Sequence, residues 1–251
     1  MLNNVTSARN KCVKLTNEKI KMTDYKKIKT AVVGVGSMGQ NHARILSEIS
    51  NLVYVFDINE SQAKKVSADF NVKYYTALDS IKEKVDAVVI AVPTEYHENY
   101  SSYFANKGNH ILVEKPIART KSEAETIIRN CEKAGVVLTV GHIERFNPVI
   151  VKAMEFLNSG IWGEIITISS KRVSNYPSRI RDVGVIVDLG IHDIDLIQYM
   201  SGSECQTIKA VSGNFENKKY FIHLEKQFRK EYYKDNFNLD INYSTICAWK
   251  K

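Results

Sequence analysis

The sequence predicts an α/β protein in which a doubly wound parallel sheet is followed by a smaller α+β domain. Three observations support this fold. Short β-branched runs alternate with amphipathic segments from Thr30 to about residue 140, which is typical of a parallel sheet with helices on both faces. A glycine-rich turn, Gly34–Gly39, follows the first of these runs. The alternation then ends after Gly141.

The individual elements follow from these local patterns. In the first domain we predict strands at 30–35, 52–57, 72–75, 87–92, 110–114 and 136–140, and helices at 39–49, 60–69, 96–106 and 121–134. After Gly141 we predict a helix at 148–158, a strand at 164–173, a helix at 188–200 and a strand at 207–213. Residues 214–251 are crowded with Lys, Tyr, Phe and Asn and show no clean period, so we predict no fold for them.

Composition excludes several classes of protein. The chain has 251 residues, of which 44% are apolar, and this is enough to bury a substantial core. Its formal net charge of +7 comes mainly from residues 1–29, which hold eight Lys or Arg and two acidic residues and leave only +1 for the remainder. We therefore expect no nucleic-acid partner for the folded body.

No segment of the sequence suggests a membrane or a metal site. The longest apolar stretch, 87–92, is too short to span a bilayer, and the N-terminus lacks the apolar segment of a secretory signal, so we expect a cytoplasmic protein. Met22 precedes the first predicted strand, and a start there would remove no predicted element. The cysteines have no metal-ligand spacing, and we expect reduced thiols at Cys12, Cys131, Cys205 and Cys247.

The glycine-rich turn predicts a nucleotide site because a strand precedes it and a helix follows it. Gly34 allows the tight turn, Gly36 lets backbone N–H groups approach a pyrophosphate, and Gly39 permits close packing of the helix. Ser37 and Met38 lie in this turn, and the positive end of the helix predicted from residue 39 then faces the phosphates. The same pattern also occurs in turns that bind no ligand.

A carboxylate at the end of the second strand supplies the other half of the nucleotide pattern. Asp57 lies 18 residues beyond Gly39, where the 2′-hydroxyl of a ribose needs an acceptor. We therefore expect NAD as the cofactor. NADP is disfavoured because Asp57 would repel a 2′-phosphate and no arginine follows it closely.

Two segments follow later strands, at the edge of the sheet where open α/β folds bind ligands. The segment after the fourth strand places Pro93, Thr94 and His97 there, although an ordinary loop with Thr94 as a helix N-cap fits equally well. The segment Glu114-Lys115-Pro116 closes the fifth strand.

Lys115 is the first candidate catalytic residue. A lysine that is held in a cleft and close to other charges can have its pKa moved toward neutrality and take part in proton transfer. The alternative is a surface salt bridge between Lys115 and Glu114.

A second candidate cluster lies on the predicted helix at 188–200. Asp188 and His192 are four residues apart, so on a helix they share one face, and a carboxylate beside an imidazole orients the ring and supports its protonated form. Asp193 and Asp195 fall on other faces, and Asp195 can pair elsewhere. Asp188 could instead cap the start of the helix.

The junction between the two domains is dense in polar residues. Gly141-His-Ile-Glu-Arg-Phe-Asn-Pro148 suggests the wall of a cleft, although His142 could equally be a hydrogen-bonded core residue. Tyr176 lies close to two arginines, Arg179 and Arg181, whose forked side chains suit a pyrophosphate, and a solvated loop fits as well.

Taken in order, these segments resemble the Gfo/Idh/MocA oxidoreductase family. The resemblance covers residues 30–213 and is carried by GVGSMGQNHAR, the strand-ending Asp57, AVPTEYH, VEKPIA, GHIERFNP and DLGIHDIDL. It implies a Rossmann domain followed by a domain with an open, mostly antiparallel sheet, through which a homo-oligomer could form. It also implies NAD(P)-dependent hydride transfer from a sugar or cyclitol hydroxyl. The stretch 176–195 is most similar to the branch that oxidises C3 of UDP-N-acetylglucosamine.

The resemblance also implies roles for the candidate residues. Lys115 and His192 would handle the proton of the sugar hydroxyl, and Asp188 would orient His192, in a cleft between the domains. Cofactor contacts would come from the glycine-rich turn, Asp57, Pro93, Thr94, His97, Glu114 and Lys115. Substrate contacts would come from Lys115, Arg145, Asn147, Tyr176, Arg179, Arg181, Asp188 and His192.

We therefore divide the chain into four parts: a basic extension (1–29), a dinucleotide-binding Rossmann domain (30–145), a partial substrate and oligomerisation domain (146–213) and a divergent tail (214–251). Family members generally continue further, so the second domain reads as truncated. Two alternatives stay open. One is an NAD-binding protein whose damaged substrate domain prevents turnover, and the other is a dehydrogenase of a free sugar or inositol.

Overall fold

The structure is a computed structural model that describes residues 25–172, 186–203 and 205–210. The chain divides into two compact units, residues 1–141 and 142–251. Within the described residues, none of the helices has the length and apolar content needed to cross a bilayer.

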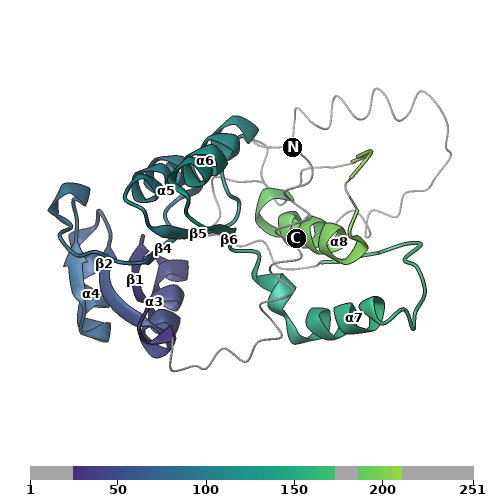
Figure 1. Cartoon of the computed structure of the whole chain (residues 1–251), viewed down its shortest axis with the longest axis horizontal. Helices are drawn as coiled ribbons and strands as arrows, with labels where there is room; N and C mark the ends of the chain where they lie inside the picture. The colour runs from purple at the N-terminus through teal and green to yellow at the C-terminus, as the bar shows by residue number, and fades with distance from the viewer. Residues whose placement is uncertain (1–24, 173–185, 204, 211–251) are drawn as a thin grey trace, which may run out of the picture. The chain divides into compact units, whose positions relative to one another are not determined.

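The first unit is built on a parallel sheet of six strands in the order β3-β2-β1-β4-β5-β6 (Figure 1). The strands are β1 (Lys29–Val33), β2 (Asn51–Phe56), β3 (Lys73–Tyr75), β4 (Ala87–Ile90), β5 (His110–Val113) and β6 (Leu138–Val140). All six predicted strands of this unit are confirmed. The order reverses between β1 and β4, and this switch point is where doubly wound sheets bind ligands.

Two pairs of helices cover the sheet, one pair on each face (Figure 1). They are α3 (Ser37–Ile49), α4 (Glu60–Phe70), α5 (His97–Asn106) and α6 (Lys121–Ala134). Alternate strand residues point to opposite faces. Val32, Val55 and Val89 pack with Ala43 of α3 and Val66 of α4. Their strand neighbours pack on the other face with residues of α5 and α6, which include Phe104, Ala105, Ile127 and Cys131.

Short polar signals set the ends of two of these helices. The Asn59 side chain accepts a hydrogen bond from Gln62 N at 3.2 Å and caps α4, which ends at Asn71 in the left-handed region. The Thr120 hydroxyl accepts from Glu123 N at 3.2 Å and caps α6, which ends at Gly135. Two short 3-10 turns, η1 (Leu78–Ser80) and η2 (Thr94–Tyr96), were not predicted.

The second unit contains helices in its described part. They are the 3-10 turn η3 (Ile143–Phe146), α7 (Pro148–Asn158), the π-helical turn η4 (Ile186–Gly190) and α8 (Ile191–Ser201). The predicted helix at 148–158 is confirmed, and Asn147 caps it by accepting from Val149 N at 3.1 Å. The α-helix predicted from residue 188 begins at Ile191 instead, because a π-helical turn precedes it.

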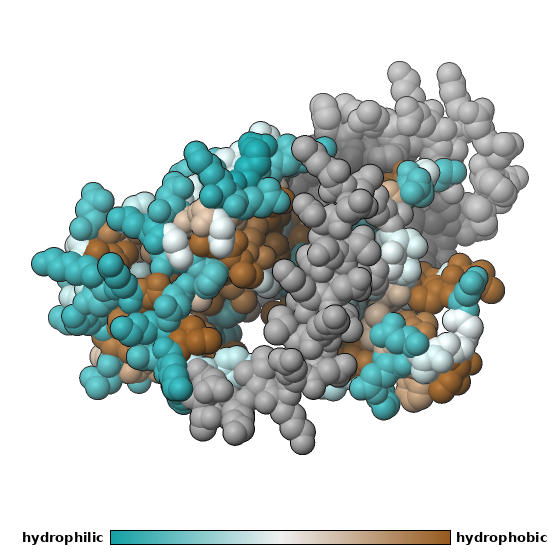
Figure 2. Space-filling view, in the orientation of Figure 1, coloured by the Kyte–Doolittle hydropathy of each residue, from teal (hydrophilic) through white to brown (hydrophobic). Residues whose placement is uncertain are grey.

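An apolar surface runs over α7. No residue of this helix is buried, and Val149 is 73% exposed. Figure 2 shows hydrophobic side chains gathered over this part of the second unit. The Phe156 and Trp162 rings stack there with centroids 4.9 Å apart.

The predicted strands of the second unit are wrong where the structure describes them. Residues 164–172 and 207–210 form no strand, while 173 and 211–213 lie outside the described residues. A strand is stable only beside another strand that bonds its N–H and C=O groups. The alternation of apolar residues predicted extended chain without showing whether a partner strand is present.

Candidate active site

The glycine-rich turn lies at the switch point of the sheet, between the ends of β1 and β4. Gly34 has φ +84°, and a Cβ there would lie 2.8 Å from the carbonyl carbon and oxygen of Ala91. A Cβ on Gly39 would lie 1.8 Å from the carbonyl oxygen of Gly34. Both positions therefore need glycine, the first for its backbone conformation and its neighbour, the second for close packing of α3 against the turn.

The middle of the turn is open. Gly36, Ser37 and Met38 are exposed, and a Cβ on Gly36 would meet nothing within 4 Å. Gly36 is the N-cap of α3, and no side chain caps this helix. The N–H groups of the first helical turn have no partner within the helix. This combination of open space and N–H groups fits a diphosphate.

Asp57 holds the same turn from the end of β2. Its carboxylate accepts hydrogen bonds from Val35 N and from Asn59 N, both at 2.9 Å. The carbonyl of Val35 accepts from the side-chain amides of Gln62, at 2.8 Å, and Gln40, at 3.3 Å. Each carboxylate oxygen can accept more than one hydrogen bond, so Asp57 keeps capacity for a ribose hydroxyl. Sequence reasoning missed Gln40 and Gln62, because side-chain contacts to the main chain leave no pattern.

The segment after β4 contributes Pro93, Thr94 and His97. Thr94 begins η2, and neither η2 nor α5 has a side-chain cap hydrogen bond, so the alternative of Thr94 as an N-cap is not supported. His97 is only 1% exposed. Its Nε2 lies 2.9 Å from the carbonyl oxygen of Val92, and its Nδ1 lies 2.9 Å from that of Pro116. These contacts of the His97 ring are with the main chain.

Glu114 and Lys115 follow β5. The Glu114 side chain is buried, and its Oε1 lies 2.7 Å from Nε2 of His42, while Oε2 accepts from Lys115 N at 3.1 Å. The carboxylate is therefore not at the surface, and a salt bridge between Lys115 and Glu114 stays an open alternative. Burial acts to raise the pKa of Glu114. The hydrogen bond and charge of His42 and the backbone N–H and charge of Lys115 outweigh burial, so the pKa lies below its ordinary value.

Sequence reasoning also missed His42. It lies three residues after Gly39 on α3, so both residues share the helix face that packs on the sheet. That spacing was a signal that this histidine points toward the strand ends.

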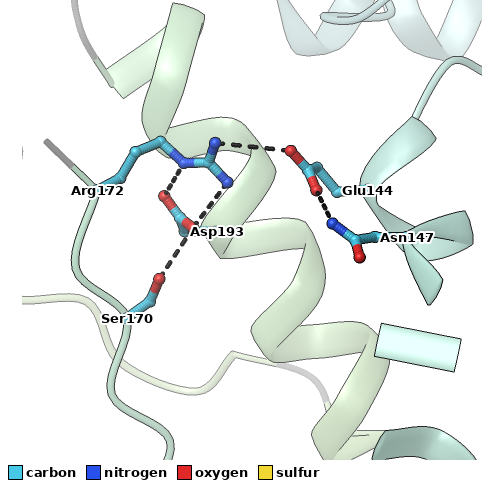
Figure 3. A network of polar contacts seen from close by, with 5 residues as sticks. All are labelled: Glu144, Asn147, Ser170, Arg172 and Asp193. Atoms are coloured by element: carbon cyan, nitrogen blue, oxygen red, sulfur yellow. Dashed lines mark hydrogen bonds and ion pairs between the residues drawn. The ribbon is translucent and has the colours of Figure 1, made fainter. Parts of the chain in front are cut away.

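The second unit pairs its buried carboxylates with arginines. Asp193 is 4% exposed and accepts from Nε of Arg172 and from the hydroxyl of Ser170, both at 2.9 Å. Figure 3 shows Asp193 between these two side chains, with Glu144 on the far side of the guanidinium, 3.6 Å from it. The Asp193 hydrogen bond is the main reason that the pKa of Arg172 lies above its ordinary value.

Two residues predicted to contact substrate have structural contacts here. Arg145 donates from Nε to Asp195 at 2.8 Å, and its guanidinium lies 5.1 Å from the centre of the Tyr199 ring. Asn147 caps α7 and donates to Glu144 at 3.4 Å. Substrate contacts by these residues stay predictions. Tyr176, Arg179 and Arg181 lie outside the described residues.

Asp188 lies in η4 and His192 in the first turn of α8. Their four-residue spacing therefore crosses a junction between π-helical and α-helical backbone. The N-cap of α8 is Gly190, and no side chain caps this helix, so the capping alternative for Asp188 is not supported. The pairing of Asp188 with His192 stays a prediction.

Comparison with known proteins shows the family of this chain. The family model described as "Oxidoreductase family, NAD-binding Rossmann fold" matches residues 28–142, and the "GFO/IDH/MocA C-terminal domain" model matches residues 150–245. The chain belongs to the Gfo/Idh/MocA family. The second match extends to residue 245, beyond Gly213, where we expected the resemblance to end. The boundary of a divergent tail at residue 214 stays a prediction.

Several relatives in the Gfo/Idh/MocA family are similar over most of this chain. UDP-N-acetylglucosamine 3-dehydrogenase of Acidithiobacillus ferrooxidans is 34% identical over 184 residues, which cover 73% of this chain and 58% of that protein. Its solved structure superposes with a TM-score of 0.70 at 32% identity, covering 76% of this chain and 62% of that one. Inositol 2-dehydrogenase 2 of Saccharopolyspora erythraea is 30% identical over 189 residues, covering 71% of this chain and 55% of that protein. The chain thus spans less than two thirds of each relative.

Proposed function

We propose that this protein is an NAD-dependent oxidoreductase that removes hydride from C3 of UDP-N-acetylglucosamine. The observation that carries the proposal is the arrangement around the switch point of the sheet. An open glycine-rich turn follows β1, Asp57 follows β2, and Lys115 follows β5 beside the buried Glu114, which contacts His42. Membership of the Gfo/Idh/MocA family supports the same reaction class.

The chain's own residues divide the work of binding and proton transfer. The N–H groups around Gly36 bind the diphosphate, and Asp57 accepts from the adenosine ribose. When bound, NAD accepts the hydride from the substrate carbon. Lys115 takes part in moving the hydroxyl proton, together with His192, which Asp188 orients. The parts given to His192 and Asp188 come from the family resemblance.

The cofactor assignment favours NAD over NADP. Asp57 carries negative charge near the ribose, and residues 58–63 contain no basic side chain that could pair with a 2′-phosphate. Glu60, which begins α4, adds a second negative charge close to Asp57 in the chain.

The substrate assignment follows the similarity to the Acidithiobacillus enzyme, whose name specifies UDP-N-acetylglucosamine. A second candidate is an inositol dehydrogenase, which the 30% identity to the Saccharopolyspora protein favours. The two differ in whether the substrate carries a nucleotide, so they are separable by experiment.

The test is NADH formation, followed at 340 nm, when the protein and NAD are mixed with UDP-N-acetylglucosamine, N-acetylglucosamine or myo-inositol. We expect NAD to be reduced with UDP-N-acetylglucosamine and not with N-acetylglucosamine or myo-inositol. Reduction with inositol and not with the nucleotide sugar would favour the second candidate. NAD binding with no reduction by any of the three would support an NAD-binding protein that lacks turnover.

A further inference from the structure

Lys115 lies between two anchor points that come from different helices. On its N-terminal side, the Glu114 carboxylate lies 2.7 Å from Nε2 of His42 on α3. On its C-terminal side, the carbonyl oxygens of Pro116 and Ile117 lie 2.9 and 3.3 Å from Nδ1 of His97 on α5. Lys115, the residue proposed for proton transfer, thus follows a side chain that contacts His42 and precedes main-chain carbonyls that contact His97.

The first anchor is the contact between the half-buried His42 ring and the buried Glu114 carboxylate. The side chains of His42 and Glu114 are 16% and 10% exposed. Glu114 is packed closely on its other side, because a Cβ on Gly141 would lie 3.2 Å from its Oε2. A buried carboxylate without its partner carries a desolvation cost, so the pair fixes Glu114. Oε2 in turn accepts from the backbone N–H of Lys115.

The second anchor joins two loops at the ligand-binding edge. His97 is almost fully buried, and Nε2 of its ring lies 2.9 Å from the carbonyl oxygen of Val92, after β4. Its Nδ1 faces the carbonyls after Lys115. The ring therefore fixes the distance between the loop after β4 and the loop after β5.

We propose that His42 and His97 are positioning residues that set the place of Lys115 relative to the glycine-rich turn. His42 acts through Glu114, and His97 acts through the carbonyls of Pro116 and Ile117. The inference rests on the proposed function, in which Lys115 moves a proton. It gives His97 a role in positioning rather than in direct contact with the cofactor.

The expected size of the effect follows from the geometry of proton transfer. A displacement of about 1 Å in a reacting group can lower a rate about 100-fold while leaving binding interactions elsewhere intact. Losing either anchor should therefore lower kcat more than it weakens the binding of NAD.

The first experiment compares His42→Ala and His97→Ala with a matched control, His110→Ala. His110 lies at the opposite end of β5, is exposed, and uses its ring to accept a hydrogen bond from Val137 N at 3.0 Å. We expect kcat to fall about 10-fold or more in the first two variants, with the Kd for NAD within about threefold of wild type. The control should keep both values. Equal loss of kcat in all three variants would overturn the proposal.

A conservative variant and a double mutant separate positioning from general destabilisation. His42→Gln keeps a side-chain N–H that can reach Glu114, and we expect it to recover part of the kcat lost in His42→Ala. If His42 acts through Glu114, combining His42→Ala with Glu114→Gln should cost no more than the worse single change. A multiplied loss of about 100-fold from two changes of about 10-fold would overturn the shared route. These measurements also stand if His97→Ala fails to fold.

A final readout needs no turnover. Labelling of Lys115 by acetic anhydride, measured by peptide mass spectrometry, is compared with and without saturating NAD. We expect NAD to protect Lys115 about fivefold or more in wild type and His110→Ala, and clearly less in His42→Ala. Equal protection in all three proteins, or none in wild type, would overturn the positioning role. Protection without NADH formation in wild type would instead count against the proposed function alone.

Discussion

At the residue scale, the glycine-rich turn separates glycines that the fold needs from one that a ligand needs. Gly34 has both a positive φ and a main-chain neighbour 2.8 Å from its would-be Cβ, whereas Gly36 has open space around it. We expect Gly34→Ala to lower the free energy of unfolding by more than about 1 kcal/mol. Gly36→Ala should change it by less than about 0.5 kcal/mol.

The same pair of variants distinguishes stability from binding. Gly36→Ala should weaken NAD binding about 10-fold or more, since a methyl group would occupy the space where the diphosphate approaches the backbone. Urea unfolding and calorimetric titration measure the two quantities. If Gly36→Ala binds NAD as tightly as wild type, the diphosphate does not lie over this turn.

Lys115 and His192 carry the proposed proton transfer. Lys115→Met and His192→Ala should leave the affinity for NAD nearly unchanged and lower turnover about 100-fold or more, the scale on which a positioned proton-transfer group acts. Steady-state kinetics and fluorescence titration of NADH check this. Loss of cofactor binding equal to the loss of turnover would contradict both roles.

At the element scale, the tie between α3 and the end of β5 should depend on pH. The pKa of Glu114 lies below its ordinary value of 4.5 in the folded protein. The ionised carboxylate therefore stabilises the fold above pH 4.5, and this stabilisation is lost as the pH falls through the folded pKa. As the pH falls below 5, the free energy of unfolding should decrease more steeply in wild type than in Glu114→Gln. If urea titrations give parallel pH profiles of the free energy of unfolding for the two proteins, the ionised Glu114 carboxylate does not stabilise the fold.

The helix α8 is held by a buried carboxylate whose partner lies outside the helix. Removing Arg172 leaves Asp193, 4% exposed, without its guanidinium. We expect Arg172→Met to lower the free energy of unfolding by about 1–3 kcal/mol. The control Lys152→Met breaks an exposed pair with Glu155 and should cost less than about 0.5 kcal/mol. Thermal unfolding, monitored by circular dichroism, measures the difference. Equal losses of stability in the two variants would contradict this role of Arg172.

Some elements of the fold can be predicted from local sequence, and others cannot. The strands and α-helices of the first unit were predicted because each satisfies its own period, whereas the 3-10 turns η1 and η2 were not. The structure shows further local signals at helix ends, such as Asn59, Thr120 and Gly135. The strands expected at 164–173 and 207–213 fail within the described residues, since a strand depends on a partner that local sequence does not name. The π-helical turn before α8 likewise has no signal in the spacing of apolar residues.

At the scale of the whole molecule, the two units differ in how far the candidate site could be predicted. In the first unit, the glycines, Asp57 and Lys115 follow strand ends, and parallel strands bring such ends to one edge. The contacts that hold them, from His42, His97 and Gln62, join residues far apart in sequence. The spacing of His42 from Gly39 indicates the side of α3 on which the histidine lies but not its partner, Glu114. In the second unit, Arg145 was predicted to contact substrate, and the structure shows its pairing with Asp195.

We propose that the first unit of this chain binds NAD through the open turn after β1 and the carboxylate after β2. Calorimetric titration of NAD and of NADP into the folded full chain tests it most directly. We expect saturable binding of one NAD per chain and binding of NADP that is weaker by about 10-fold or more. Folded protein that gives no heat with NAD, or that binds NADP more tightly, would contradict it.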